Sequence, residues 1–163
     1  MKGERMRLNF RPLIIALLSI PLTVMAAGDP GGGNDPAAST DPVLQQYGEA
    51  TSRKDWAAAA AIVRDAAAKT PGNADYHNLY AYAVRKGTNP NMDLVFQEYN
   101  EALRINPKHR GAHEYIGEAY LMVGNLAKAK EHLARLDSLC FFPCDEFTDL
   151  KKAVAAYEAK QPR

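Results

Sequence analysis

The stretch His113-Glu-Tyr-Ile-Gly-Glu-Ala-Tyr-Leu-Met-Val-Gly-Asn-Leu-Ala-Lys-Ala-Lys-Glu-His-Leu133 decides the fold of this chain. Its apolar residues recur at helical spacing on both sides of a central Gly-Asn turn, which predicts two amphipathic helices. Small residues at Gly117 and Ala129 allow the two helices to approach closely, and Tyr120 and Leu133 fill the space between them. The stretch therefore predicts an antiparallel helical hairpin.

The hairpin belongs to a repeat. Pro71, Pro107 and Pro143 stand 36 residues apart, and a pair of helical patterns precedes each proline. An internal period of this size is typical of helical solenoids, in which each unit buries its apolar face against its neighbours. Such a chain presents a surface and has no need of a catalytic pocket.

The spacing of His113, Ile116-Gly117, Tyr120, Ala129 and Leu133 follows the pattern W-x2-L-G-x2-Y … A-x3-F. On these residues the sequence resembles the tetratricopeptide repeat (TPR) family over 41–160. The resemblance implies an all-α fold, a right-handed α-solenoid of about three helix pairs plus a C-terminal capping helix. The expected segments are units 41–73, 74–109 and 110–143 and a cap at 145–160.

The other two units fit the same frame less closely. In the second unit the frame places Tyr80 at the glycine position, with extra residues in the loop 87–93. In the first unit it places Tyr47 there. Thr40 or Asp41 before Pro42, and Asn91 or Asp93 in the loop, are expected N-caps. The cap carries one apolar stripe, formed by Phe147, Leu150, Val154 and Tyr157.

The resemblance also implies a binding groove, because the first helix of each pair lines a concave surface in this family. Carried over by position, the frame puts a mixed set of side chains there: Leu44, Gly48, Thr51, Ser52, His77, Ala81, Val84, Arg85, Glu114, Glu118, Leu121 and Met122. The positions that clamp a peptide carboxylate in some family members hold neither Lys nor Asn. A protein or peptide bound through mixed contacts is expected; alternatively, the charges are solvated helix faces.

The N-terminus has the layout of a secretory signal peptide. Four basic residues precede an apolar run from Leu13 to Val24, which is too short to span a bilayer, and small residues follow at Ala26 and Ala27. We expect residues 1–26 to be removed and residues 27–40, rich in Gly, Pro and Asp, to form a disordered leader. An uncleaved anchor is the alternative. The chain is then periplasmic or secreted, with no membrane span after cleavage.

Composition argues against several classes of function. Removing residues 1–26 leaves 16 basic and 18 acidic residues of the 20 and 19 in the whole chain, a net charge of about −2. This balance gives no electrostatic basis for binding nucleic acid. No catalytic or nucleotide-binding motif is present, so we expect a non-enzyme without cofactor. A monomer is expected.

Cys140 and Cys144 are the only cysteines, in a C-x3-C arrangement. An exported chain meets an oxidising compartment, so a structural disulfide is the first interpretation. Two thiolates also suit Cu(I), with His132 as a third ligand, and a thiol-exchange role is a further alternative. A copper- or thiol-handling factor on the same scaffold is thus the second hypothesis. His109 and His113 carry a weaker metal signal.

Overall fold

The computed structural model describes residues 41–161, and the predicted signal peptide and leader lie outside them. Every regular element in the described residues is an α-helix. They are α1 (Pro42–Ser52), α2 (Trp56–Lys69), α3 (Ala74–Lys86), α4 (Met92–Ile105), α5 (Arg110–Met122), α6 (Leu126–Leu139) and α7 (Asp145–Ala159). The prediction of three helix pairs and a capping helix is confirmed.

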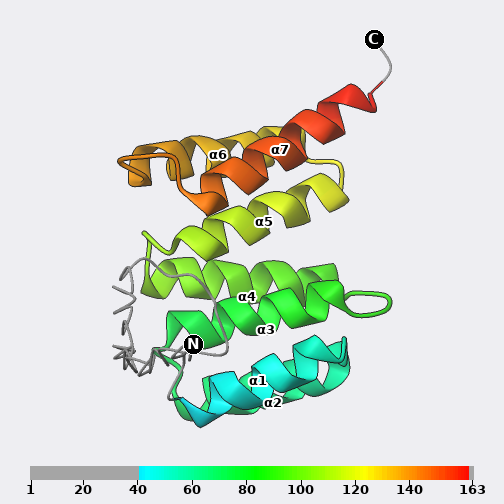
Figure 1. Cartoon of the computed structure of the whole chain (residues 1–163), viewed down its shortest axis with the longest axis vertical. Coiled ribbons are helices and arrows are strands. Elements are labelled where there is room, and N and C mark those ends of the chain that lie inside the picture. Colours follow the sequence, from blue (N-terminus) through cyan, green and yellow to red (C-terminus); the bar gives the residue numbers. More distant parts are fainter. Residues whose placement is uncertain (1–40, 162–163) are drawn as a thin grey trace, which may run out of the picture. The chain divides into compact units, whose positions relative to one another are not determined.

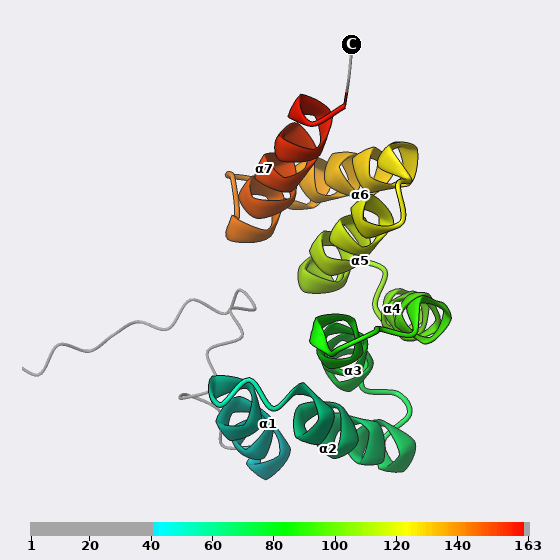
Figure 2. The ribbon, with the colours of Figure 1, turned by 90° about the vertical axis from the view of Figure 1, so that its right-hand side faces the viewer.

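Helices next to each other in sequence also pack against each other (Figures 1 and 2). Most of these helices are preceded by an N-cap residue with a short polar side chain. Asp41 accepts from the backbone N–H of Val43 at 2.8 Å, directly before Pro42, and Asn91 accepts from that of Leu94 at 3.2 Å. These caps are two of those predicted, and they satisfy donors that a helix N-terminus leaves free.

The core is a series of small clusters, each shared between neighbouring pairs. Ala59, Val95 and Ala129 occupy corresponding places in the second helices, and each is 0% exposed. A small or branched side chain at this place lets the first helix of each pair approach closely. Since each cluster is local, the stack is held together by nearest-neighbour contacts, as in other solenoids.

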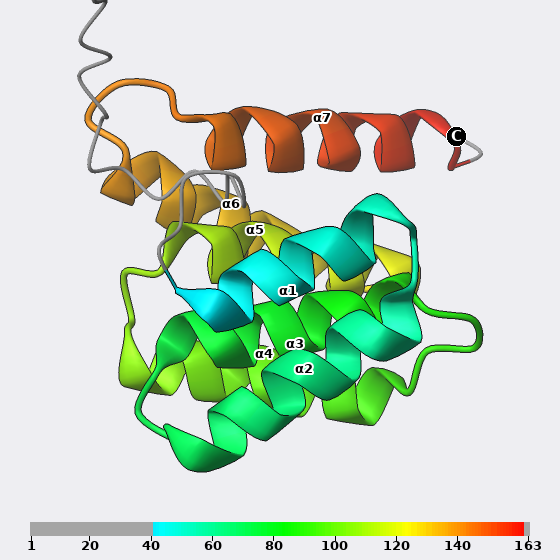
Figure 3. The ribbon, with the colours of Figure 1, turned by 60° about the horizontal axis from the view of Figure 1, so that its bottom comes forward.

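The last helix closes the stack. α7 packs on both α5 and α6 and forms the final layer in Figures 1 and 3. Leu150 and Val154 are buried, and Phe147 packs against the same cluster, whereas Lys151 and Lys152 remain exposed. This confirms the predicted apolar stripe and polar outer side. No helix within residues 41–161 has the length and hydrophobicity needed to cross a bilayer.

Candidate functional site: an aromatic row and a buried acid

Three aromatic side chains form a row across α2, α3 and α5. The ring centroid of Tyr82 lies 6.0 Å from that of Trp56 and 4.7 Å from that of Tyr115. All three side chains are partly exposed. We call Trp56, Tyr82 and Tyr115 the aromatic row; it offers π-faces and edges together with polar groups.

Two cations lie along the row. The guanidinium carbon of Arg85 is 5.3 Å from the ring centroid of Tyr82 and 5.7 Å from that of Tyr115. The ammonium of Lys86 lies 5.8 Å from Trp56 and 5.9 Å from Tyr82, measured in the same way. These distances are within the range of cation–π attraction. The row is therefore held in a defined arrangement.

Arg85 is buried, contrary to the expectation of a groove side chain open to solvent. Its Nε donates to the Tyr99 hydroxyl at 3.3 Å, and its Nη2 lies 2.8 Å from Oε2 of Glu118. Burial lowers the pKa of Arg85, but Tyr99 and Glu118 raise it by more, so the charge is kept. Arg85 is mainly a link between α3, α4 and α5.

Glu114 lies on the same side of α5 as Glu118, one turn earlier. It is 9% exposed, and within residues 41–161 it makes no hydrogen bond or ion pair. Burial, followed by the charges of Glu118, Asp149 and Glu146, raises the pKa of Glu114 to about 8, and Arg85 opposes this effect. Near neutral pH the carboxyl therefore exists in both protonation states.

A buried polar side chain without a hydrogen-bond partner among the described residues lies on α3. Asn78 on α3 is 1% exposed, and neither Nδ2 nor Oδ1 has a hydrogen-bond partner in the described structure. Its Nδ2 is 3.6 Å from the place that a Cβ of Gly111 would occupy. The sequence analysis did not select Asn78, although an asparagine inside a predicted helix was a usable signal.

The structure corrects the register used for the predicted groove. His77 and His113 each place Nε2 against the carbonyl of the proline six residues earlier, at 3.2 Å and 3.1 Å. Corresponding positions in α3 and α5 are therefore 36 residues apart. Ala81, not Tyr80, occupies the place of Gly117, where it is 0% exposed. Asn78 correspondingly takes the place of Glu114.

The remaining predicted groove residues are dispersed. Leu44 is half-buried beside Ala66, Ala67 and Tyr76. The Thr51 hydroxyl donates to the carbonyl of Gly48, which is itself buried. Met122 is 53% exposed at the end of α5, and its sulfur lies 3.9 Å from Nη1 of Arg85.

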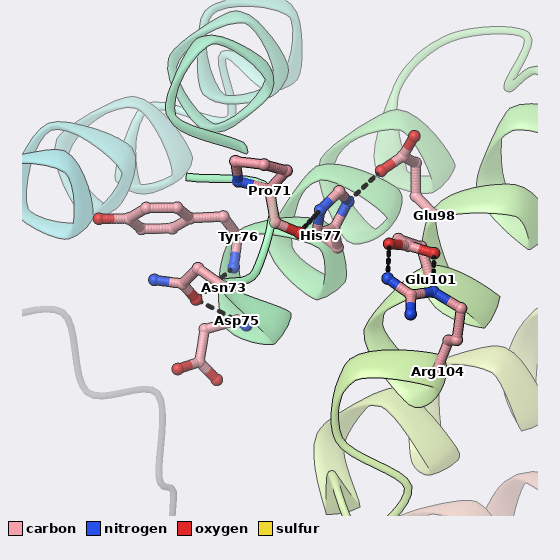
Figure 4. Close-up of polar contacts among 8 residues, drawn as sticks. All are labelled: Pro71, Asn73, Asp75, Tyr76, His77, Glu98, Glu101 and Arg104. Atoms are coloured by element: carbon pink, nitrogen blue, oxygen red, sulfur yellow. Dashed lines mark hydrogen bonds and ion pairs between the residues drawn. The ribbon is translucent and has the colours of Figure 1, made fainter. Parts of the chain in front are cut away.

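His77 lies between α3 and α4. Figure 4 shows its imidazole between the carbonyl of Pro71 and the carboxylate of Glu98, whose Oε2 is 2.7 Å from Nδ1. The neighbouring ion pair of Arg104 and Glu101 lies on α4 alone. His77 thus joins the two helices of its pair, and its role in partner binding stays a prediction.

The two cysteines form a disulfide with an S–S distance of 2.07 Å. It joins the C-cap of α6 to the N-cap of α7, and the enclosed Phe141 and Phe142 are exposed. His132 is held elsewhere, with Nδ1 2.9 Å from Nδ1 of His113. No group of three possible metal ligands exists among residues 41–161. The alternative ligand set of Cys140, Cys144 and His132 is therefore not assembled.

Comparisons with known proteins identify the fold. The TPR2B domain of yeast Sti1, in its complex with pHsp70, matches with a TM-score of 0.65 and 16% identity, over 73% of this chain and 95% of that one. The Yersinia enterocolitica type III secretion translocator chaperone SycD matches with a TM-score of 0.62 and 17% identity, over 79% and 94%. No family model and no curated protein sequence matches. The chain has the TPR fold.

Proposed function

We propose that this protein is an exported adaptor that binds a protein or peptide through the surface that carries the aromatic row. The observation that carries the proposal is the contact of three partly exposed aromatic side chains across three helices, with Arg85 and Lys86 beside them. Aromatic residues and arginine dominate the energetics of protein interfaces. A row already held by packing loses little conformational entropy when a partner binds.

The comparison with TPR proteins supports a binding function. One neighbour is a domain in complex with pHsp70, and the other is a chaperone of a secretion translocator. An interaction scaffold without catalytic activity is the function most compatible with such a fold and with the arrangement of Trp56, Tyr82 and Tyr115.

Site-specific cross-linking tests the binding face. A photoreactive p-benzoylphenylalanine replaces Tyr82, and the matched control carries it at Asp65, whose side chain is 61% exposed on α2. After illumination in intact cells, we expect a discrete adduct from position 82 and none from position 65. Equal labelling from both positions, or adducts from position 65 alone, would contradict the proposed face.

Export is the second part of the proposal, and it rests on the basic and apolar pattern of residues 1–26. N-terminal sequencing of the protein from a periplasmic extract should give a chain that begins at Ala27 or Gly28. A full-length chain recovered only from the cytosol would refute export without affecting the binding face.

A further inference from the structure

Two adjacent phenylalanines project from the connection between α6 and α7. Phe141 is 93% exposed and Phe142 is 75% exposed, which makes them the most exposed large apolar side chains in residues 41–161. Their rings contact each other edge to face, with centroids 4.9 Å apart, and neither ring packs into a core cluster of the described residues. Exposed apolar groups gathered in one place mark surfaces at which proteins associate.

The disulfide holds this pair of rings in place. It joins Cys140 at the C-cap of α6 to Cys144 at the N-cap of α7, and Pro143 restricts the backbone between them. We call residues 140–144 the phenylalanine loop. Closing so short a loop stabilises the fold little, but it limits the conformations that the two rings can adopt. Such preorganisation reduces the entropy that the loop loses when it binds a surface.

Acidic residues flank the phenylalanine loop. Asp137 lies on the last turn of α6 and Asp145 begins α7; both are exposed, and neither makes an ion pair within residues 41–161. Glu146 follows, with its carboxylate 3.5 Å from Nε of Arg110. The nearest exposed cation along α6, Arg135, is more than one turn before the loop. Apolar rings between unpaired carboxylates are poorly suited to an anionic bilayer surface, which attracts basic segments.

The aromatic row offers a surface that complements the phenylalanine loop. Lys86 lies over two of its rings, is exposed, and makes no ion pair within the described residues. Arg53 and Lys54 are exposed in the turn that precedes Trp56, and Asp55 is engaged there as the N-cap of α2. Phenylalanine rings pack favourably on the faces of Trp and Tyr. Carboxylates at the edge of such a contact are attracted by the cations beside the row.

One copy of the chain cannot bring these two surfaces together. The phenylalanine loop follows the end of α6, whereas Lys86 lies at the end of α3, directly before the α3–α4 loop. Figures 1 and 3 show the α6–α7 and α3–α4 connections at opposite ends of the helices. The packing of each helix on its neighbours keeps these ends apart. The loop and the row can therefore meet only between two copies.

We propose that the phenylalanine loop of one copy docks on the aromatic row of a second copy, so that copies associate head to tail. The two phenylalanine rings pack on the faces of the row, while Asp137 and Asp145 approach Lys86. Because the two surfaces differ, each pair of copies keeps one free loop and one free row, and further copies can add. The inference rests on the proposed function, since it uses the row as a binding surface, and it names a second copy as the partner.

Sedimentation equilibrium of the purified full chain tests the association. The contact is small, so we expect a dissociation constant on the order of 10–100 µM and an average mass that rises over this concentration range. Phe141→Ser with Phe142→Ser should weaken association at least tenfold, whereas Val123→Ser, at an exposed apolar side chain of α5, should leave it unchanged. A monomer at all concentrations, or association that the loop variant leaves intact, would overturn the inference.

Cross-linking from position 82 separates this inference from the proposed function. If copies dock as inferred, the adduct should have twice the mass of the chain. A monomeric chain that gives an adduct with a different protein overturns the inference alone and leaves the proposed function standing. A monomeric chain that gives no adduct overturns both.

A mixture of two variants tests the direction of the contact. The loop variant keeps an intact row, and Tyr82→Ser keeps an intact loop, so each should be monomeric alone and the mixture should form a 1:1 complex that does not grow. Because Tyr82 is partly buried, Lys86→Glu supplies a second row variant at an exposed position, with an expected loss of about fivefold in affinity. Lys69→Glu, an exposed cation at the other end of α2, is its control. A mixture that stays monomeric would overturn head-to-tail docking.

Reduction of the disulfide and a vesicle assay supply two further readouts. Reduction should weaken association by about threefold to tenfold, because the freed rings lose more entropy on binding. An unchanged affinity would overturn the role given to the disulfide. Flotation of the chain with phosphatidylcholine vesicles, lost in the loop variant and seen in place of self-association, would assign the loop to a bilayer and overturn docking between copies.

Discussion

The second and third helix pairs each have a histidine at the corresponding position, but the partner of its Nδ1 differs between the two pairs. In both pairs its Nε2 lies against a proline carbonyl, at 3.2 Å for His77 and 3.1 Å for His113. Nδ1 of His77 faces the carboxylate of Glu98, whereas Nδ1 of His113 faces Nδ1 of His132. Nδ1 of His77 therefore faces an oxygen acceptor, whereas the third pair brings two ring nitrogens together, one of which must accept.

The comparison shows that corresponding positions of the two repeats keep the same place in the fold while the charge of the side chains around them differs. Burial, followed by the nearby His113, lowers the pKa of His132 to about 4. Asn78 and Glu114 form a second matched pair, since they occupy corresponding positions with a neutral amide in one unit and a buried acid in the other. The third unit therefore responds to pH at two positions where the second does not have the same groups.

The largest expected effect comes from Glu114→Gln. A carboxyl whose pKa is raised to about 8 on folding keeps its proton in the native state, so its presence lowers stability as the pH rises from 4.5 to 8. The wild type should lose about 3–4 kcal/mol over this window relative to Glu114→Gln. Urea unfolding at several pH values measures the difference, and parallel curves for the two proteins would contradict it.

The substitution His132→Glu replaces the partner of His113 by a carboxylate, as in the contact of His77 with Glu98 in the second pair. Because the pKa of His132 is lowered to about 4, its contribution to stability is present above pH 6.5 and is lost as the pH falls to 4. The wild type should lose about 2–3 kcal/mol more than the variant across this range. The measurement is the unfolding free energy from pH 4 to 7.

The reciprocal exchange, Glu98→His, is the control. It should give the second pair the acid sensitivity of the third. If neither substitution alters how the unfolding free energy falls from pH 7 to pH 4, the residue that faces Nδ1 does not control the acid sensitivity of these pairs.

A third contrast concerns Ala81 and Gly117, which occupy corresponding places. A Cβ on Gly117 would lie 2.6 Å from Cδ2 of Leu150, which is fully buried. Gly117→Ala should therefore destabilise by about 1–2 kcal/mol, despite the better helix propensity of alanine. In a Leu150→Ala background the same change should become neutral or stabilising. Thermal unfolding of the four proteins tests this coupling.

The smallest effect is expected from the disulfide. Replacing Cys140 and Cys144 by serine frees a loop of only a few residues, so the loss should be about 1 kcal/mol. Hydrogen exchange should show the loss of protection confined to the start of α7, with the second pair unaffected. A uniform loss over all helices would instead indicate that this link supports the whole stack.

Much of the fold was predictable because it depends on local sequence. The helices follow from apolar spacing, their starts from Asp41 and Asn91, and their close approaches from small residues such as Ala129. The same spacing predicted that Leu150 and Val154 of α7 would close the stack. Each of these features concerns residues a few positions apart, where helical geometry fixes which side chains share a face.

The candidate site was only partly predictable. Glu114 and Glu118 were selected, but a register one residue off in the second unit selected Ala81 and missed Tyr82 and Asn78. The error arises easily, since α3 has two buried small residues near this place, Ala81 and Ala83. The contacts of His77 and His113 with the carbonyls of Pro71 and Pro107 set the register.

The sequence by itself thus determined a TPR-like stack of helix pairs and predicted export, because periodicity, caps and the N-terminal pattern are local. The tertiary structure determined which polar and charged side chains are buried and which of them have partners. It buried Arg85 between two tyrosines and paired it with Glu118, yet among residues 41–161 it left both polar atoms of Asn78 without a hydrogen-bond partner. Burial and pairing depend on side chains brought together from distant parts of the chain, and it is these two properties that set charge and binding chemistry.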